Sequence, residues 1–569
     1  MKKFSIIVLS LLAVLCFALA GCIGNDKTRI STSYFEVSGK YKTELSCSVP
    51  SDTENFYFSS KFSVDKDAEY IISYDAEGNN TVSNNSAQLT TGDNVFYITV
   101  THNNKSKVYT VNVYRKALYV VTFAVDGYTV EPQYVEEGKK ATEPIASEWG
   151  VMFDWNFNFD AEIYSNCSVT GTASVLPKED VSMEYFSIYV NSDSLLEKQP
   201  FVYEVSSEVI KVAYEGVELE ESLWRYYEDL GTMEIMPEAF TTVGEDKTIK
   251  ILTRDKLYVI NLIVATFAIE RTQDLNMGNT FEISYMQKAG GATTSDARKQ
   301  ESHWDGYFVL GRNLDFTGQR VQFDVWAYNN VGGMDLYGFA GTFNGLGHAL
   351  SNIILDGYIG GDGHGWYSLF GNLEATGLIK NLRIVNFLAE DDGFEGILSL
   401  NGKGKLDNVY IETVLNKCSA GGKPGTNTAG LLCKFSYITE MTNCTFVIRT
   451  GTDRDTTYPA LFYDFKQDVT PNFNGTIVIS DYSIQAKYLD YGGKAYSDSI
   501  STNKIVLGQA HTVALSNITK VLKNGLDITN NSGVTITSDG VTLNSGVWDL
   551  DSTFVFIGDN QAKAINFTM

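Results

Sequence analysis

Basic residues, histidine and proline are scarce in this chain, and each shortage argues against a class of structure or function. Lysine and arginine number 44 against 69 acidic residues, so the formal net charge is −25. Binding of nucleic acid or of anionic lipid is disfavoured, because both rely on basic side chains. The five histidines show no metal-ligand spacing, and no G-x-S-x-G, Walker or H-E-x-x-H motif is present. The sequence therefore predicts no nucleic-acid partner, no metal site and no cofactor.

Cysteine is sparse as well, and the spacing of the cysteines does not indicate a disulfide framework. Of seven cysteines, Cys16 and Cys22 lie in the N-terminal segment, which leaves an odd number without regular spacing or a C-x-x-C pair. They predict neither a set of disulfides nor a zinc site. Nine prolines stand against 32 phenylalanines and 33 tyrosines, and no long amphipathic helical pattern is evident. This composition predicts an all-β chain of several domains.

The N-terminal segment has the composition of an export signal. Two lysines precede a mostly apolar run over residues 4–18, which is too short for a transmembrane helix. The run ends in Leu-Ala-Gly-Cys22, which resembles the bacterial lipobox and implies cleavage before Cys22 and lipidation of its sulfur. We expect a signal peptide over 1–21, an anchor and linker over 22–32, and an extracytoplasmic protein lipid-anchored to the bacterial membrane. The alternative is an ordinary secretory signal with an incidental cysteine.

A short pattern returns four times in the second half of the chain. Each copy is an asparagine followed by alternating apolar residues, at separations of 29, 27 and 35 (381−352, 408−381 and 443−408). The period of two with one constant apolar face predicts a strand whose inner side is buried by stacking on its neighbours. We expect a parallel β-helix with an asparagine ladder at one corner, ending where Thr476 replaces the asparagine. The four asparagines are Asn352, Asn381, Asn408 and Asn443.

Residues 341–355, G-T-F-N-G-L-G-H-A-L-S-N-I-I-L, and residues 368–387 carry a family resemblance. Their pattern is similar to the GLUG-type repeats of bacterial surface proteins, and residues 306–316 resemble the usual first coil. The resemblance implies a right-handed parallel β-helix in an extracellular setting. We expect this domain to span residues 272–480.

Smaller β modules are expected on both sides of the helix. Two alternating runs, 94–100 and 107–116, flank an Asn-rich turn and predict a β-hairpin. Residues 33–115, which end in this hairpin, resemble a bacterial cadherin-like β-sandwich. V-T-F, G-K-K-A-T-E-P and an aromatic cluster around Trp155 make residues 117–176 similar to the β-grasp-like Listeria-Bacteroides repeat. V-A-Y-E-G-V-E-L within 181–268 resembles Ig-like modules, and 481–569 is expected to be a small β-sandwich without a family.

A carboxylate pair is the first candidate site. Asp356 and Glu412 are expected in one outward column two coils apart, about 9.6 Å at the backbone, with Arg383 in the neighbouring column. That separation is at the wide edge for an inverting glycoside hydrolase. The simpler interpretation is a solvated face with a loose ion pair.

A glycine-rich loop, 357–367, is the second candidate, because insertions between coils often bind ligands. Three of its aromatic residues can stack on sugar rings, and two polar residues can bond hydroxyl groups. The alternative is a turn whose aromatic side chains cover the solenoid. The acidic stretch 390–395 is a weak candidate for calcium, since it lacks a defined ligand order. The loop residues concerned are Tyr358, Asp362, His364, Trp366 and Tyr367.

Taken together, these patterns favour a lipid-anchored surface protein that binds a glycan or another cell. The expected partner is a polysaccharide, or a protein on the surface of a host or other cell. The function is then adhesion without catalysis. Two alternatives remain open at this point: a β-helical polysaccharide lyase or glycoside hydrolase, and a structural spacer without a ligand.

The anchor gives the first testable prediction. Because a lipobox acts only through the cysteine sulfur, Cys22→Ala is expected to release the chain or leave it unprocessed. Detergent phase partitioning of cells expressing either form measures this. A Cys22→Ala chain that is processed and still enters the detergent phase with the wild type contradicts the lipid anchor.

Overall fold

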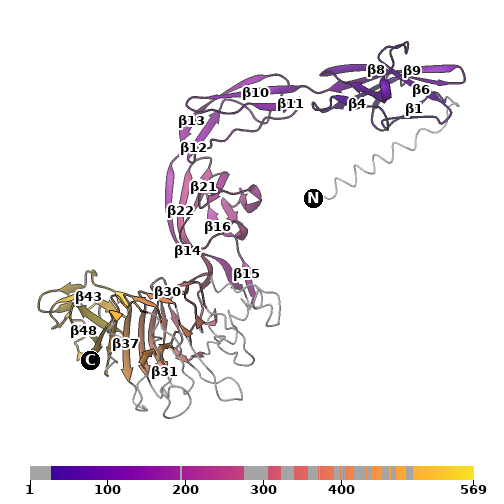
Figure 1. Ribbon diagram of the computed structural model, residues 1–569. Helices are drawn as coiled ribbons and strands as arrows, with labels where there is room; N and C mark the ends of the chain where they lie inside the picture. Colours follow the sequence, from indigo (N-terminus) through magenta and orange to yellow (C-terminus); the bar gives the residue numbers. More distant parts are fainter. Residues whose placement is uncertain are drawn as a thin grey trace, which may run out of the picture. The chain divides into compact units, whose positions relative to one another are not determined.

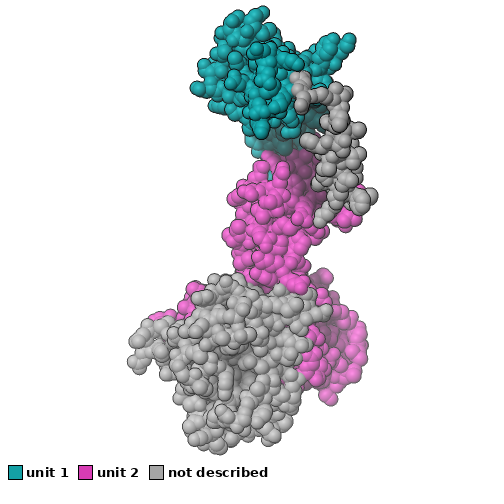
Figure 2. Space-filling view, turned by 90° about the vertical axis from the view of Figure 1, so that its right-hand side faces the viewer, with its two compact units in different colours: residues 1–176 teal, residues 177–569 magenta. Residues whose placement is uncertain are grey.

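The computed structural model describes most of the chain between residue 27 and the C-terminus. Nearly every element in it is a strand, and the helices of the described residues are four short 3-10 turns, Ser83–Asn85, Glu221–Leu223, Pro237–Ala239 and Thr272–Asp274. The chain divides into two compact units, 1–176 and 177–569 (Figure 2). The described residues are 27–192, 195–274, 306–321, 339–355, 369–370, 372–389, 397–398, 401–402, 404–415, 430–433, 438–450, 460–462, 470–481 and 491–569.

The first module of unit 1 is built on a five-stranded sheet in the order β2-β3-β9-β8-β6. Strands β6, β8 and β9 of this sheet are labelled in Figure 1. Its long hairpin pairs β8 with β9 from Gly92↔Arg115 to His102↔Lys105, and Asn103 and Asn104 turn it with positive φ angles of 46° and 63°. The predicted hairpin is thereby confirmed. The strands are β1 (Ile30–Ser31), β2 (Glu36–Ser38), β3 (Glu44–Val49), β4 (Asn55–Tyr57), β5 (Ser63–Val64), β6 (Glu69–Ser73), β7 (Ser86–Gln88), β8 (Gly92–His102) and β9 (Lys105–Arg115).

The second module of unit 1 is a four-stranded sheet in the order β11-β10-β13-β12, with β10 and β13 parallel. Its aromatic cluster is part of the core: Phe153 is buried, and Trp155 packs on Phe123 while its indole N–H donates to Pro144 O at 3.0 Å. The strands are β10 (Leu118–Val125), β11 (Gln133–Glu136), β12 (Val151–Trp155) and β13 (Cys167–Val175).

Unit 2 begins with two sheets that enclose an apolar core. One contains β18-β17-β21-β22 with β14 beside β22, and the other is β16-β20-β19. The strands are β14 (Lys178–Ser192), β15 (Leu195–Lys198), β16 (Phe201–Glu204), β17 (Val209–Tyr214), β18 (Val217–Glu218), β19 (Trp224–Tyr227), β20 (Thr232–Ile235), β21 (Gly244–Thr253) and β22 (Leu257–Ile269).

The sequence predicted a domain boundary between residues 268 and 272. The structure instead shows that this module continues into the repeat region. The end of β22 pairs in parallel with β23, from Phe267↔Phe308 to Ile269↔Leu310, so one sheet continues from the module into the repeats. The backbone groups at the start of the repeats are therefore paired by β22. A parallel sheet that stopped there would expose an open edge, which proteins generally cover.

The repeats form a stack of coils with parallel strands, here named the coil stack (306–497). One sheet runs β23-β26-β30-β33-β36, a second runs β24-β27-β31-β34-β37-β39-β40, and apolar side chains fill the space between them. The stack continues to β40, beyond the predicted end at 480. Its strands are β23 (Tyr307–Leu310), β24 (Leu314–Asp315), β25 (Arg320–Val321), β26 (Thr342–Asn344), β27 (Ala349–Ser351), β28 (Ile354–Leu355), β29 (Asn372–Leu373), β30 (Leu378–Lys380), β31 (Arg383–Ala389), β32 (Asn401–Gly402), β33 (Lys405–Asp407), β34 (Tyr410–Leu415), β35 (Gly430–Cys433), β36 (Glu440–Thr442), β37 (Thr445–Thr450), β38 (Ala460–Phe462), β39 (Ile477–Ser480) and β40 (Lys494–Ser497).

The four asparagines do not share one corner. Strand pairing places Asn381, Asn408 and Asn443 in one column, because Lys380 pairs with Asp407 and Asp407 with Thr442. Asn352 instead lies opposite Asn386, since Ser351 pairs with Val385 and Ile354 with Leu388. The predicted ladder of four was therefore wrong in its first member. Both corners of a coil use an asparagine before an inward apolar residue, so spacing alone cannot tell one corner from the other.

These asparagines share a backbone conformation that explains their identity. Their φ angles are 58°, 50°, 53° and 52°, and that of Asn386 is 55°. The left-handed conformation costs most residues with a Cβ about 1–2 kcal/mol, and asparagine adopts it more readily than the others. Amide contacts add to it where the columns stack: Asn408 Nδ2 donates to Asn381 Oδ1 at 2.9 Å, and Asn386 Nδ2 donates to Asn352 Oδ1 at 2.7 Å.

The first column ends at a glycine and not at Thr476. Because Thr445 pairs with Ile477, the position opposite Asn443 is Gly475, whose φ is 67°. A Cβ on Gly475 would lie 2.5 Å from Asn443 Oδ1, so a side chain there would have to displace the Asn443 amide. Thr476 lies one residue further on, buried, and its hydroxyl donates to Met441 O at 2.8 Å. The ladder does end in this coil, although the residue that ends it was misplaced.

The C-terminal region after the stack forms two sheets around its own core, within the span 481–569 for which a small β-sandwich was expected. The sheets have the orders β41-β48-β47-β43-β44 and β42-β46-β45. The strands are β41 (Ile500–Lys504), β42 (His511–Val513), β43 (Ile518–Lys523), β44 (Leu526–Asp527), β45 (Val534–Ile536), β46 (Val541–Leu543), β47 (Thr553–Gly558) and β48 (Ala562–Thr568).

The corner conformation gives the second prediction. Asn408→Gly keeps access to positive φ and loses only the amide, whereas Asn408→Val adds backbone strain worth about 1–3 kcal/mol. We expect the valine variant to be the less stable by that amount, measured as amide hydrogen exchange of residues 404–415 in the full chain. Equal exchange in the two variants would show that residue 408 does not adopt a left-handed conformation.

Candidate functional site

The outer face of the coil stack is apolar where it faces the C-terminal sheets. Tyr410 of β34, Val447 of β37 and Ile479 of β39 are buried there, although their side chains point away from the interior of the stack. They pack against side chains of β43, β47 and β48, namely Leu522, Val555, Ala562 and Ala564. The C-terminal domain therefore covers this face of the stack, and both belong to the same compact unit.

A glycine turn brings the two parts into close contact. Asn524 and Gly525 join β43 to β44 with φ angles of 47° and 81°. A Cβ on Gly525 would lie 2.4 Å from the Tyr410 ring, so the turn rests directly on that ring. Next to it, Arg383 donates from Nη1 to Asn524 O at 2.9 Å and from Nε to Gly347 O at 2.7 Å. Burial lowers the pKa of Arg383 from its ordinary value.

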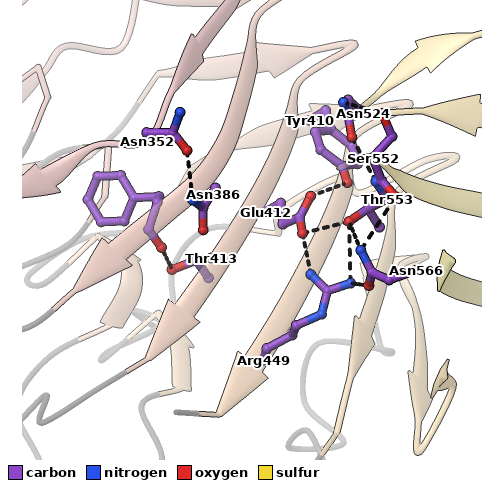
Figure 3. Close-up of polar contacts among 11 residues, drawn as sticks. Asn352, Asn386, Tyr410, Glu412, Thr413, Arg449, Asn524, Ser552, Thr553 and Asn566 are labelled. Atoms are coloured by element: carbon purple, nitrogen blue, oxygen red, sulfur yellow. Dashed lines mark hydrogen bonds and ion pairs between the residues drawn. The ribbon is translucent and has the colours of Figure 1, made fainter. Parts of the chain in front are cut away.

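Within this contact, a polar network surrounds Glu412 (Figure 3). Its Oε1 accepts from Arg449 and from the Thr553 hydroxyl at 2.7 Å, and its Oε2 accepts from the Tyr410 hydroxyl at 3.1 Å. Arg449 also donates to Asn566 Oδ1 at 2.6 Å. Glu412 is only 7% exposed, and a buried carboxylate is tolerated when it is paired and hydrogen-bonded in this way.

Tyr410 is the most enclosed titratable group of the network. Burial, followed by the negative charge of Glu412, raises the pKa of Tyr410 well above its usual value. The hydroxyl therefore stays protonated and remains a donor to Glu412. The network thus places the Glu412–Arg449 ion pair among hydroxyl and amide groups and joins side chains of the stack to side chains of the C-terminal domain.

The carboxylate pair expected from the sequence is not supported by the register. Glu412 pairs with Val447; the preceding residue, Ile411, pairs with Ile384, and Ile384 pairs with Leu350 and not with a residue next to Asp356. Ile354 pairs with Leu388, and Leu388 with Val414, so the strand before Asp356 is already offset from the column of Glu412. Asp356 itself lies outside the described residues. The expectation of a solvated face was also wrong, because the C-terminal domain covers it.

Several other candidate residues lie outside the described ranges. These are the lipidation candidate Cys22, the loop residues Tyr358, Asp362, His364, Trp366 and Tyr367, and the acidic stretch 390–395. They stay predictions. Among the residues that the structure describes, no group of three His, Cys, Asp or Glu side chains is arranged to hold a metal ion. None of the helices in these ranges has the length and apolar content to cross a membrane.

The sequence contains one feature that indicates the covered face, which is that some strands of the stack are apolar at their outward positions too. Residues 445–448 and 477–479 are apolar or small at outward as well as inward positions, and strands of this kind are buried on both sides. Arg449 follows the first of these runs as an isolated charge. Its partners Thr553 and Asn566 come from strands more than 100 residues later, which no local pattern can connect to it.

Comparison with known proteins yields only distant similarity. No family model and no curated protein matches the chain. An I-band fragment of titin is 11% identical, covering 41% of this chain and 98% of the fragment at a TM-score of 0.13. SGBP-B of a Bacteroides ovatus mixed-linkage glucan utilization locus, in complex with a heptasaccharide, is 9% identical over 43% of this chain and 70% of that one, at 0.11. The four N-terminal Ig domains of Dscam1 isoform 7.44 are 8% identical over 40% and 79%, at 0.12. TM-scores this low establish neither fold nor function.

The network gives the third prediction. Glu412→Gln leaves the buried Arg449 charge uncompensated, so we expect a loss of about 3–5 kcal/mol in the stability of this contact. The double variant Glu412→Leu with Arg449→Met removes both charges and is expected to recover most of that loss. Amide exchange of residues 553–558 in the full chain measures the effect.

The matched control for this prediction is Lys405→Ala, which breaks the exposed Lys405–Glu440 ion pair of the same two coils, on the other sheet of the stack. Exposed pairs contribute about 0–1 kcal/mol, so little change is expected. If Glu412→Gln has no larger effect than Lys405→Ala, Arg449 is not a buried charge that depends on Glu412 as its partner.

Proposed function

We propose that this chain is a lipid-anchored bacterial surface protein that binds a glycan or another cell without catalysis, with its coils forming a right-handed parallel β-helix. Cys22 would carry the lipid, and the modules of unit 1 would separate the binding region from the membrane. The lipobox-like segment and the GLUG-like repeats support this proposal. The parallel pairing of the strands between β23 and β40 is compatible with it.

The observation that carries the choice of binding over catalysis is the environment of Glu412. The enzyme alternative relied on this carboxylate, with Arg383 nearby, to act on a polymer at the outer face. Both side chains bond to the C-terminal domain or to the adjacent coil: Glu412 to Thr553, and Arg383 to Asn524 and Gly347. A general acid or base must reach the bond that it cleaves, and a residue enclosed between two domains does not.

The proposed binding site is the loop 357–367, with its three aromatic residues. In sequence it connects β28, which ends at Leu355, to β29, which begins at Asn372, and both strands belong to parallel pairs of coils. Inserted loops of solenoids are common ligand sites, because they leave the repeating fold intact. Stacking of sugar rings on aromatic faces needs no catalytic group, which agrees with the absence of nucleophile motifs in the sequence.

The fourth prediction tests this site. On a glycan array, Trp366→Ala is expected to reduce affinity by about 1–3 kcal/mol through loss of stacking. Tyr41→Ala is the control, since Tyr41 is an aromatic residue of unit 1 that is 73% exposed, and it should bind like the wild type. Binding that is indifferent to Trp366→Ala would remove the loop as the site. New reducing or unsaturated ends after incubation with a bound polymer would contradict the absence of catalysis.

A further inference from the structure

A lysine, an asparagine and a glutamate meet where the first module of unit 2 contacts the coil stack. Asn344 of β26 and Lys380 of β30 are direct partners on adjacent parallel strands, about 4.8 Å apart at the backbone. Glu245 of β21 binds both: its Oε1 accepts from Asn344 Nδ2 at 2.9 Å, and its Oε2 accepts from Lys380 Nζ at 2.5 Å. One carboxylate therefore bridges an amine and a side-chain amide.

The Asn344 amide is polarised and shielded from water. Its Oδ1 accepts from the backbone N–H of Leu346 at 3.0 Å and from Asn381 Nδ2 at 3.1 Å, a pair of donors suited to charge on that oxygen. Asn344 is 1% exposed, and its Nδ2 also donates to the Tyr307 hydroxyl at 3.0 Å. Burial raises the pKa of Tyr307, which marks the surroundings as poorly solvated. The side chain of Lys380 is 16% exposed.

We propose that Lys380 and Asn344 join in an intramolecular isopeptide bond, with Glu245 as the proton carrier. The Lys380 ammonium passes a proton to Glu245, and the free amine attacks Asn344 Cγ. The Nζ–Cγ bond forms while the carbonyl electrons move onto Oδ1, which the two donors stabilise. Glu245 then protonates Nδ2, the Cγ–Nδ2 bond breaks as the carbonyl returns, and ammonia leaves. The second Nζ proton follows through Glu245, so the released product is ammonium and no oxidant is needed.

The bond would fix two neighbouring coils covalently at the end of the stack that joins the module. It requires three features together: an amine, a side-chain amide on the adjacent strand and a shared carboxylate. The ion pair one coil further on lacks one of them, since Lys405 bonds to Glu440 and its strand partners are Leu378 and Glu440. Lys405 therefore offers a control with the same amine and a carboxylate but no amide partner on either strand.

Peptide mapping of the full chain after unfolding tests the bond directly. No lysine or arginine lies between Val321 and Ile379, so an unmodified chain yields a tryptic peptide 321–380. A linked Lys380 is not cleaved, so the peptide extends to Arg383 and is lighter by one ammonia. A second protease that cuts between residues 344 and 380 leaves the two halves joined. We expect this linked product in the wild type and in Lys405→Arg.

The variants assign the roles. Lys380→Arg keeps the positive charge but has no nucleophilic amine, and it should give only linear fragments. Glu245→Gln keeps an acceptor but cannot carry a proton, and the linked fraction should fall at least tenfold. A linear 321–380 peptide in the wild type overturns the proposal, as does conversion of Asn344 to aspartate with normal cleavage after Lys380. A linked product undiminished in Glu245→Gln overturns the role given to Glu245.

Discussion

Four successive coils of the described stack turn the same corner through a residue with positive φ, and this backbone constraint organises that part of the repeat region. Asn381, Asn408 and Asn443 meet it with a side chain that tolerates the conformation, and Gly475 meets it where a Cβ would collide with the amide below. After the corner, the next residue points inward and is buried. The same sequence pattern thus encodes both a turn and the start of a core strand, which is how a short motif specifies stacking.

The second requirement is that an apolar outer face must be covered. Tyr410, Val447 and Ile479 would each expose a large side chain if the stack stood alone, and burying such a side chain contributes about 1.5–3 kcal/mol. The C-terminal sheets provide the cover, and the Glu412–Arg449 pair lies beside it. Since a buried pair contributes little net stability, the apolar contact supplies the attraction while the hydrogen bonds fix the orientation of the two parts.

Local patterns predicted the strands well and the long-range contacts poorly. The hairpin of residues 94–116 follows from alternation and a turn, and the inward columns that contain Leu382 and Ile411 are buried as the period of two requires. The register of Asn352 was misassigned because two corners carry the same motif. The surroundings of Glu412 could not be foreseen, because Thr553 is 141 residues away and its pairing depends on how one domain packs on another. The candidate binding loop remains a prediction from sequence.

Hydroxyl-radical footprinting of the full, unmodified chain tests the central claim that the C-terminal domain covers the outer face of the coil stack. Tyr410 is 2% exposed, whereas Tyr41 and Tyr134 are 73% and 67% exposed and provide internal references with the same chemistry. The account predicts that Tyr410 is oxidised far more slowly than either reference and becomes reactive only when the chain unfolds. Oxidation of Tyr410 in the native chain at the rate of Tyr41 would contradict the covered face.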